Sequence, residues 1–520
     1  MILNIITVLA FLALAGFKLK NGFHMLQQEM YLNNEYYHWY KGKKKVLFSD
    51  IFAPCVGILA GFINIYAGKI TYILITLLTL ALLIKIAPKA KKAFVITARV
   101  KRLITTSVIL GIISAAVIMC LLNTTFFITM VLVIALNISM GYLVAVVNKI
   151  NSPVESLINR WYINDAKRII NELPSLKVVG ITGSYGKTST KYILTKLLSE
   201  KYHTLMTPES YNTTMGVVKT VRNSLTAAHE IFVCEMGAKY VGDIKEICDI
   251  VRPSYGIITS IGPQHLETFL NIENIIKTKY ELYDAVENKE NVVVNVSSPV
   301  IRANMREGVT PCGIDMEDGG RYYAKDVSYG TFGVRFVMCC EDGTEISLET
   351  KLLGRHTVSN IIAAAAMALK LGVEPEQIRY AVRRLEPVPH RLQMKNHGNG
   401  ITVIDDAFNS NAEGSKAAVD VLGKFEKGKR MLITPGMIEL GDKEYEINFE
   451  FGRCAAKNCD YIILVGEKQT IPIKDGIKSA GYGGGLYVAA DLGAALIKMN
   501  DVASDGWTVL FENDLPDLYL

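Results

Sequence analysis

The amino-acid sequence predicts two α/β domains that follow an all-α membrane domain. Apolar blocks of transmembrane length recur before residue 148, strand-like runs alternate with helical patterns after residue 176, and a glycine-rich loop joins the first of these strands to its helix. The predicted parts are a membrane domain at 1–148, a linker with a short helix at 149–175, a central domain at 176–390 and a C-terminal domain at 391–520.

Composition limits the classes of function. Half of the 520 residues are hydrophobic, and most of this excess lies before about residue 150. The formal net charge is +6, but many Lys and Arg residues cluster beside apolar blocks, at 41–45 and 89–102, which is typical of membrane topology and argues against nucleic-acid binding. The nine cysteines include no C-x-x-C pair, so we expect reduced thiols in a cytoplasmic compartment, without a zinc ribbon or a disulfide framework.

The N-terminal region predicts five membrane-spanning helices. The apolar blocks are residues 2–17, 51–67, 70–86, 104–122 and 126–147. A signal peptide is the alternative for the first block, but no basic residue precedes it and four blocks follow, so we expect a retained anchor. The basic links predict a multi-pass protein of the plasma membrane, with its N-terminus outside and everything after about residue 148 in the cytoplasm. The later four blocks contain no Asp or Glu, which favours anchoring or lipid contact over transport.

The glycine-rich loop predicts an ATP site. Residues 180–190 read GITGSYGKTST between an apolar run and a predicted helix, so backbone N–H groups and a helix N-terminus would converge on a polyphosphate. Lys187 would reach the terminal phosphates, and the Thr188 hydroxyl would hold Mg²⁺. The pattern G-x-x-x-x-G-K-[ST] has a glycine where Ile181 stands, and an ordinary strand-to-helix turn is the alternative. The residues expected around the nucleotide are Gly183, Ser184, Gly186, Lys187, Thr188 and Ser189.

The region after residue 176 predicts two mainly parallel sheets. The first set of strand-like runs lies at 178–181, 231–234, 256–259 and 292–296, and the second lies at 401–404, 431–434, 461–465 and 508–511. Such sheets place the glycine-rich loop at a carboxyl edge. Residues 321–352 predict an appended β-hairpin. The second set has no phosphate loop and predicts a smaller, Rossmann-like domain that closes over the first.

Polar residues follow several of these strands. Glu235 ends one strand and is either a second metal ligand or a helix cap. His265 follows the next strand, where a lone histidine is more often structural than a ligand. Lys279 belongs to an ordinary amphipathic helix pattern. The pair at 405–406 ends a strand in two acids, which suits ribose or substrate contacts or a solvated turn.

Seven motifs, taken in order, resemble the Mur ligase family. They are GITGSYGKTST, EMGA, IGPQHLE, LGRHTVSN, HRL, DDAFNSN and PGMIELG, and they cover about residues 176–520. The resemblance accounts for Ile181, because T-G-x-x-G-K-[ST] is the family's form of the phosphate loop. It implies an ATP-dependent amide ligase of cell-wall precursor synthesis, in which a substrate carboxylate is phosphorylated by ATP and an amine, such as D-alanyl-D-alanine, then displaces phosphate.

The resemblance also implies roles for residues at matched positions. Thr188 and Glu235 would hold a first Mg²⁺, and Glu235 with His265 a second. Lys279 would be carbamylated and serve the metal. Lys187, Glu235, His265 and Lys279 form the expected catalytic set, and Thr188, Glu235, His265 and Lys279 the expected metal ligands.

Further matched positions lie toward the C-terminus. Asn360 would approach the adenine, Arg391 the phosphates and Asp406 the ribose, whereas His356 and Asn409 match motifs with less certain roles.

Two departures from the family pattern leave the substrate open. The family's N-terminal domain, which grips a uridine nucleotide, is replaced here by the apolar blocks, and the asparagine-rich stretch after the first helix is short. The expected partners are ATP, a muropeptide-like carboxylate, an amine donor, the lipid bilayer and other cell-wall enzymes. The alternatives are a ligase-like domain whose ATP binding gates the membrane segment, and a ligase of the same fold with another acceptor, such as a glutamate polymer or a lipid-linked peptidoglycan.

Overall fold

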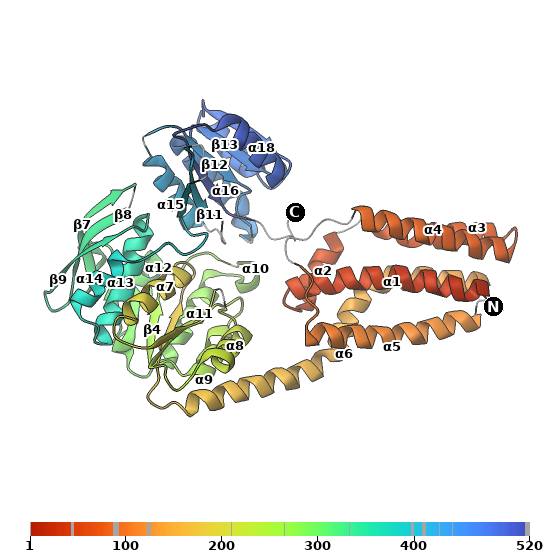
Figure 1. The fold of residues 1–520 in the computed structure, drawn as a ribbon, viewed down its shortest axis with the longest axis horizontal. Coiled ribbons are helices and arrows are strands. Elements are labelled where there is room, and N and C mark those ends of the chain that lie inside the picture. The colour runs from red at the N-terminus through yellow and green to blue at the C-terminus, as the bar shows by residue number, and fades with distance from the viewer. Residues whose placement is uncertain are drawn as a thin grey trace. The chain divides into compact units, whose positions relative to one another are not determined.

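The computed structural model describes the chain except for residues 1, 43–45, 87–92, 122–125, 210, 265, 332, 397–399, 408–411, 426, 439 and 515–520. The chain divides into two compact units, one ending at Trp161 and the other covering Tyr162–Leu515. Figure 1 shows long helices in the first unit, and sheets covered by helices in the second.

The described residues of the first unit form helices joined by turns. These are α1 (Ile2–Gln28), α2 (Asn33–Gly42), α3 (Val46–Gly61), α4 (Ile65–Ile86), α5 (Ala98–Leu121) and most of α6 (Phe126–Asn171). Within the described ranges, four of them are long and apolar enough to cross a membrane, namely α1, α4, α5 and α6. The prediction of five such helices is therefore wrong by one.

The missing span is the block predicted at 51–67. Helix α3 ends at Gly61 and α4 begins at Ile65, so the block contains a turn. At this turn the side-chain oxygen of Asn64 accepts a hydrogen bond from the backbone N–H of Tyr66 at 2.8 Å, which is the contact of a helix N-cap. The apolar part of α3 is left too short to span a bilayer.

The break predicted at 68–69 lies inside α4. Gly68 ends no helix there but lets α3 and α4 approach closely, because a Cβ on it would lie 2.8 Å from the carbonyl oxygen of Gly57. A glycine between two apolar blocks can indicate a loop, but small residues also occur where helices pack tightly, as Gly68 does here.

Helix α6 extends well beyond the apolar block predicted at 126–147. The helix is 46 residues long, so the stretch predicted as a linker, 149–175, is helical as far as Asn171. Near its end, Ala166 and Ile170 are buried among side chains of the central domain. The short helix predicted in this linker is therefore longer than expected and continuous with the last apolar block, because the backbone remains helical where charged residues replace apolar ones.

The central domain is built on a six-stranded parallel sheet. Its strands are β1 (Lys177–Thr182), β2 (Thr204–Met206), β3 (Ile231–Glu235), β4 (Tyr255–Ile258), β5 (Val292–Asn295) and β6 (Thr310–Cys312), in the order β2-β3-β1-β4-β5-β6. Strand β1 lies between β3 and β4, which places the loop after it at the centre of the carboxyl edge. The predicted parallel sheet is confirmed, with two short strands, β2 and β6, added.

Helices cover both faces of this sheet. One face carries α8 (Thr214–Ser224), α9 (Asp243–Val251) and α11 (Ile272–Ala285), and the other carries α7 (Lys187–Leu198), α13 (Arg355–Lys370) and α14 (Pro375–Arg383). Strand β1 serves both cores because its side chains alternate: Val178 packs on the first face, and Val179 and Ile181 pack on the second. Short helices α10 (Leu266–Phe269) and α12 (Pro299–Ala303) complete the domain.

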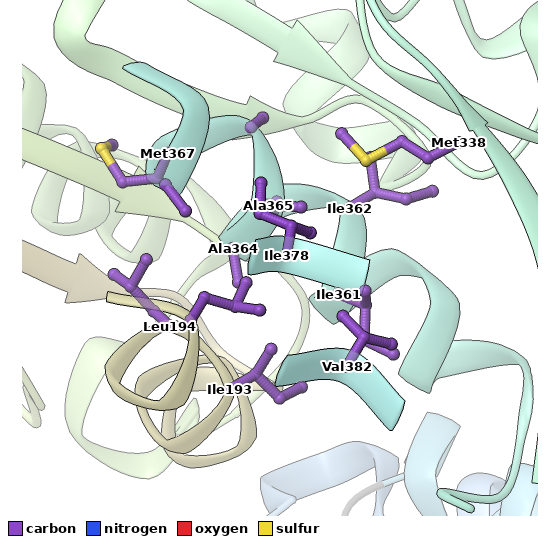
Figure 2. Packing of buried hydrophobic residues seen from close by; sticks show 14 of the residues in the cluster. Ile193, Leu194, Met338, Ile361, Ile362, Ala364, Ala365, Met367, Ile378 and Val382 are labelled. Atoms are coloured by element: carbon purple, nitrogen blue, oxygen red, sulfur yellow. The ribbon is translucent and has the colours of Figure 1, made fainter. Parts of the chain in front are cut away.

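The second core is formed where α13 packs against α7. Ala364 and Ala365 of α13 have 0% exposed surface, and Ala364 lies near Leu194 of α7, as Figure 2 shows. Ile378 and Val382 of α14 close the same cluster. The small alanine side chains let the two helices approach, so α13 lies beside the helix that follows the phosphate loop.

A second, antiparallel sheet lies over this core. It has three strands, β7 (Tyr323–Gly330), β8 (Gly333–Cys339) and β9 (Glu345–Thr350), in sequence order. The predicted hairpin at 321–352 therefore gains a third strand. Alternate residues of β8 and β9, such as Phe336 and Leu348, are buried in the core, as expected of a sheet with one solvent-exposed face.

The C-terminal domain contains another six-stranded sheet. Its strands are β10 (Gln393–Asn396), β11 (Thr402–Asp406), β12 (Arg430–Thr434), β13 (Tyr461–Val465), β14 (Gly485–Ala489) and β15 (Thr508–Glu512), in the order β10-β11-β15-β12-β13-β14. Only the pairing of β10 with β11 is antiparallel. The helices are α15 (Ala412–Gly423), α16 (Glu444–Asn458), α17 (Ile471–Ser479) and α18 (Leu492–Val502). The four predicted strands are confirmed, and β10 and β14 are added.

Candidate active site

The glycine-rich loop connects β1 to α7 in a backbone conformation that requires glycine. Gly183 has φ +149° and Gly186 has φ +81°. A Cβ on Gly183 would lie 2.1 Å from the Thr259 hydroxyl, and one on Gly186 would lie 2.7 Å from the Asn360 side-chain oxygen. The two glycines therefore provide both the turn and the close packing that a phosphate cradle needs.

Neighbouring loops hold the glycine-rich loop in place. The backbone N–H of Ser184 donates to the carbonyl of Ser260 at 2.7 Å. The Ser184 hydroxyl donates to the carbonyl of Gly262 at 2.9 Å. These contacts join the loop to the segment after β4.

The Lys187 side chain folds back over the loop. Its ammonium donates to the carbonyl of Gly183 at 2.7 Å and to that of Ser184 at 3.2 Å. Burial lowers the pKa of Lys187 to about 8, and the nearby Glu235 carboxylate opposes this shift. A polyphosphate bound to the loop would supply a negative counter-charge to this buried ammonium. The loop therefore has the features expected of an ATP site.

Glu235 lies beside the start of α7. It ends β3, and the parallel register places it opposite Ile181 of β1. Its Oε1 atom accepts hydrogen bonds from the Thr188 hydroxyl at 3.1 Å and from the Asn212 amide at 3.0 Å. Its side chain is 1% exposed. The two residues predicted to share a first metal ion are thus in contact, and Glu235 caps no helix, since the N-cap of α9 is Gly242.

The oxygen atoms at this position fit Mg²⁺. Thr188 and Glu235 offer hard oxygen ligands beside the phosphate loop, and Mg²⁺ typically binds one or two carboxylates and keeps water and phosphate for its other positions. In the part of the chain that the structure describes, no group of three or more His, Cys, Asp or Glu side chains could hold a metal.

Lys279 is buried, which the amphipathic pattern alone did not predict. It lies in α11 with 2% of its surface exposed, and its ammonium is 5.9 Å from the centre of the Phe269 ring. Burial, and secondarily the charge of Lys187, lower the pKa of Lys279 well below the usual range of a lysine. A neutral amine is the form that reacts with carbon dioxide, so carbamylation of Lys279 stays a prediction that the site suits. His265, predicted as another ligand, lies outside the described residues.

Asn360 lies beside the phosphate loop. It belongs to α13, is 7% exposed, and its side-chain oxygen accepts a hydrogen bond from the Thr190 hydroxyl at 3.3 Å. This contact joins α13 to α7. The predicted approach of Asn360 to an adenine stays a prediction.

A cavity of about 260 Å³ adjoins the same helices. Its polar lining includes Ser189 and Tyr192 from α7, His356 from α13, and Arg391. Its apolar lining is Ile193, Leu352, Leu353, Leu385, Pro387, Val388 and Leu392. Lys196, Thr357, Arg384 and Glu386 also line the cavity, so apolar and polar side chains are mixed around it. A larger cavity of about 730 Å³, lined by residues such as Arg252 and Asn291, lies before β4 and β5, at the opposite edge of the sheet from the loop.

Two residues predicted to contact the nucleotide lie near each other at the start of the C-terminal domain. Burial lowers the pKa of Arg391, while the charge of Asp406 raises it. Burial raises the pKa of Asp406 to about 6, and Arg391 opposes the shift. The carboxylate of Asp406 accepts a hydrogen bond from the backbone N–H of Leu392 at 3.1 Å. Asn409 lies outside the described residues.

Two residues of this site, Lys191 and Asn212, were not predicted from the sequence. Lys191 is fully buried in α7, 3.0 Å from the Glu235 carboxylate, and Asn212 donates to the same carboxylate. A signal for Lys191 was present, because it lies three residues before Leu194 on the apolar face of the helix. Asn212 lies in the short asparagine-rich stretch after the first helix, and the resemblance assigned that stretch no role in this chain.

The fold and the site define a nucleotide-dependent enzyme with a phosphate loop. Residues 181–368 match the Mur ligase middle domain, and residues 390–512 match the glutamate ligase domain of Mur ligases. The UDP-N-acetylmuramoyl-tripeptide--D-alanyl-D-alanine ligase of Mycobacterium tuberculosis is 31% identical over 350 residues, which are 65% of this chain and 68% of that protein. The chain therefore belongs to the Mur ligase family, whose members are ATP-dependent ligases that form amide bonds.

Solved structures agree with this assignment. A crystal structure of MurF from Acinetobacter baumannii has a TM-score of 0.61 and 26% identity, over 68% of this chain and 77% of that one. The MurF ligase of Thermotoga maritima, in complex with ADP, has a TM-score of 0.60 and 25% identity, over 68% of this chain and 80% of that one. The resemblance found in the seven motifs is confirmed.

Proposed function

We propose that this protein is a membrane-anchored ligase that uses ATP and Mg²⁺ to add an amino acid or a dipeptide to a cell-wall muropeptide precursor. The observation that carries the proposal is the contact between Thr188 and Glu235, 3.1 Å apart, beside the Lys187 ammonium. This arrangement supports the proposal, because a hydroxyl, a carboxylate and a cation beside a phosphate loop are the groups that would bind Mg²⁺ and the terminal phosphates of ATP.

The chemistry requires two transfers at one position. A carboxylate oxygen of the precursor attacks the γ-phosphorus, the bond between that phosphorus and the β–γ bridging oxygen breaks, and ADP leaves. An amine nitrogen then attacks the acyl carbon of the acyl phosphate, the carbon–oxygen bond to phosphate breaks, and the nitrogen loses a proton. The product is an amide, together with phosphate and ADP.

The residues of the chain would act mainly through charge and position. The loop N–H groups and Lys187 bind the phosphates and stabilise negative charge that develops during transfer. Thr188 and Glu235 would hold Mg²⁺, which supplies further positive charge to the phosphates. Carbamylation of Lys279 would place an anion at a buried position near Lys187. Such electrostatic contributions are typically the largest part of catalysis in phosphoryl transfer.

The cavity between α7 and α13 is the proposed site of the adenine. Its apolar walls, including Leu353 and Leu392, would pack against the base, while His356 and Arg391 supply polar contacts. Arg391 and Asp406 would contact the phosphates and the ribose.

Four apolar helices support a membrane location. By length and composition α1, α4, α5 and α6 could each cross a bilayer. The family matches begin only at residue 181, after the last of these helices has ended at Asn171. We propose that they hold the ligase at the plasma membrane with its catalytic domains in the cytoplasm, and that the precursor is linked to lipid.

A direct assay tests the function. The full-length protein in lipid nanodiscs is given ATP, Mg²⁺ and D-alanyl-D-alanine, with either a UDP-linked or a lipid-linked muramoyl-tripeptide, and phosphate release and the amide product are measured. We expect amide product with either acceptor and none when ATP is omitted. We also expect a higher kcat/KM for the lipid-linked acceptor. Phosphate release that no muropeptide acceptor stimulates would refute the proposed substrate class. Equal kcat/KM for the two acceptors would refute the lipid linkage alone.

A further inference from the structure

Lys191 is a buried lysine for which the reaction described above has no role. Its side chain is 0% exposed, in α7, one turn after Thr188. Lysine is almost never fully buried without a charged partner. Here the partner is Glu235, whose Oε2 atom lies 3.0 Å from the Lys191 ammonium. The ammonium also donates a hydrogen bond to the carbonyl of Glu209.

The two oxygens of Glu235 have different surroundings. Oε1 accepts hydrogen bonds from the Thr188 hydroxyl and the Asn212 amide, at 3.1 and 3.0 Å. Oε2 lies against Lys191, with the ion pair as its contact and no well-aligned hydrogen bond. One oxygen therefore faces the phosphate loop, and the other faces a buried cation.

We propose that Lys191 is a positioning residue that presents a single oxygen of Glu235, Oε1, to Mg²⁺. This inference rests on the proposed function, because it takes Thr188 and Glu235 as the metal ligands. Mg²⁺ demands nearly ideal octahedral geometry at about 2.0–2.1 Å. A carboxylate whose second oxygen is held by an ammonium binds through one oxygen only, in a fixed orientation.

The same ammonium also orders the loop that precedes α8. Glu209, whose carbonyl Lys191 binds, lies three residues before Asn212, which donates to Oε1. In addition, the Thr207 hydroxyl accepts a hydrogen bond from the backbone N–H of Glu235 at 3.0 Å. Lys191 thus orients Glu235 directly through the ion pair, and indirectly through the loop whose Asn212 and Thr207 contact Glu235.

Metal binding provides a test that does not depend on turnover. Mn²⁺ is used as the probe, and its free concentration is followed by electron paramagnetic resonance with full-length protein in detergent and saturating ADP. For Lys191→Met, which keeps the length of the side chain but removes its charge, we expect the Kd of Mn²⁺ to rise at least about tenfold, or about 1.4 kcal/mol. The affinity for ADP without metal should stay within about twofold of wild type.

Lys201→Met is the matched control. The Lys201 ammonium also donates to a backbone carbonyl, that of Gly372, but the residue is exposed and lies outside the proposed site. The control should bind Mn²⁺ as the wild type does. If Lys191 only stabilised the fold, Lys191→Met would lower the melting temperature and leave the Kd of Mn²⁺ unchanged, and that result would overturn the inference.

A second pair of variants covers the case in which Lys191→Met does not fold, since it leaves a buried carboxylate without a counter-charge. Glu235→Gln is compared with Glu235→Gln combined with Lys191→Met, in which both charges are gone. Because Lys191 acts through Glu235, the double variant should bind Mn²⁺ no more weakly than Glu235→Gln. Tenfold weaker binding by the double variant would contradict this. Absence of Mn²⁺ binding by the wild type would overturn the proposed metal site itself, and the inference with it.

Discussion

The Asn360 side chain occupies the space beside Gly186, so that a Cβ on Gly186 would lie 2.7 Å from the Asn360 oxygen. The two residues come from α13 and from the loop before α7, and each constrains the other. The position also has φ +81°, which disfavours any residue with a Cβ.

Gly186→Ala is expected to abolish ATP binding, because the loop must shift away from Asn360 and its N–H groups then lose their alignment. Gly319→Ala is the control, since Gly319 has a similar φ of +80° but nothing within 4 Å of its Cβ position. We expect the control to lose about 1–2 kcal/mol of stability and to bind ATP normally. ATP affinity is measured by calorimetry, and normal affinity in Gly186→Ala would contradict the role of the loop.

Lys187→Ala is expected to reduce ATP turnover more than tenfold while the protein still folds. The ammonium neutralises charge that develops on the transferred phosphoryl group, a contribution of several kcal/mol in such sites. Phosphate release measures turnover, and circular dichroism checks the fold. A variant that retained more than about a tenth of wild-type turnover, a loss below about 1.4 kcal/mol, would show that Lys187 is not at the phosphates.

The lowered pKa of Lys187 predicts a dependence of stability on pH. Burial lowers this pKa to about 8, whereas an unfolded lysine titrates at about 10.4. Between these values the unfolded state binds more protons than the folded state, so the stability of the nucleotide-free protein should rise with pH from about 8 to about 10.4. Below pH 8 both states are protonated at Lys187, so this group should make no contribution to the pH dependence of stability. Lys187→Met should lack this part of the rise, which melting temperatures from pH 7.5 to 10 will show. Identical slopes in the two proteins would rule out the lowered pKa.

Lys279→Ala is expected to be inactive and to regain activity when a short carboxylate such as formate is added. The reason is that a carbamylated Lys279 would be an anion in a buried place, and the added carboxylate can occupy the space that the truncation leaves. Lys277→Ala, in the same helix, is the control and should keep wild-type turnover. Full activity of Lys279→Ala without any additive would mean that no carbamate is needed.

Glu155→Gln is expected to destabilise the helical unit by about 1–3 kcal/mol. The Arg102 guanidinium donates one hydrogen bond to each oxygen of the nearly buried Glu155 carboxylate, at 2.6 Å from Nε and at 2.8 Å from Nη2. The control is Lys245→Gln, which breaks an exposed ion pair with Asp249 and should have no measurable effect. Thermal unfolding in detergent measures both. An unchanged melting temperature in Glu155→Gln would contradict the expected stabilisation.

The sequence was most informative where local pattern and topology agree. The loop at 180–190 and the strand that ends at Glu235 were predicted, and parallel pairing then brings Glu235 next to Thr188, because neighbouring parallel strands end at the same edge. The motif order of the resemblance added Asn360, Arg391 and Asp406, which no local pattern distinguishes from ordinary polar residues.

The remaining features depend on tertiary contacts. Strand β2 has three residues, which are too few to give a periodic pattern in the sequence. It is recognised as a strand only by its hydrogen-bonded pairing with β3. The burial of Lys279 and Lys191 follows from what packs around their helices, since the same sequence on a surface helix would expose both. The glycine at 68 was interpreted as a break because a sequence does not show which helix packs against it.

The contact between Thr190 and Asn360 joins residues that are 170 positions apart in the chain. A ribosome adds about 5–20 residues per second, so roughly 9–34 s pass between synthesis of the first and of the second. The phosphate loop therefore emerges long before the helix that packs against it. During this interval the nascent chain holds an incomplete nucleotide site, and the ability to bind ATP arises late in biosynthesis, once α13 has been made.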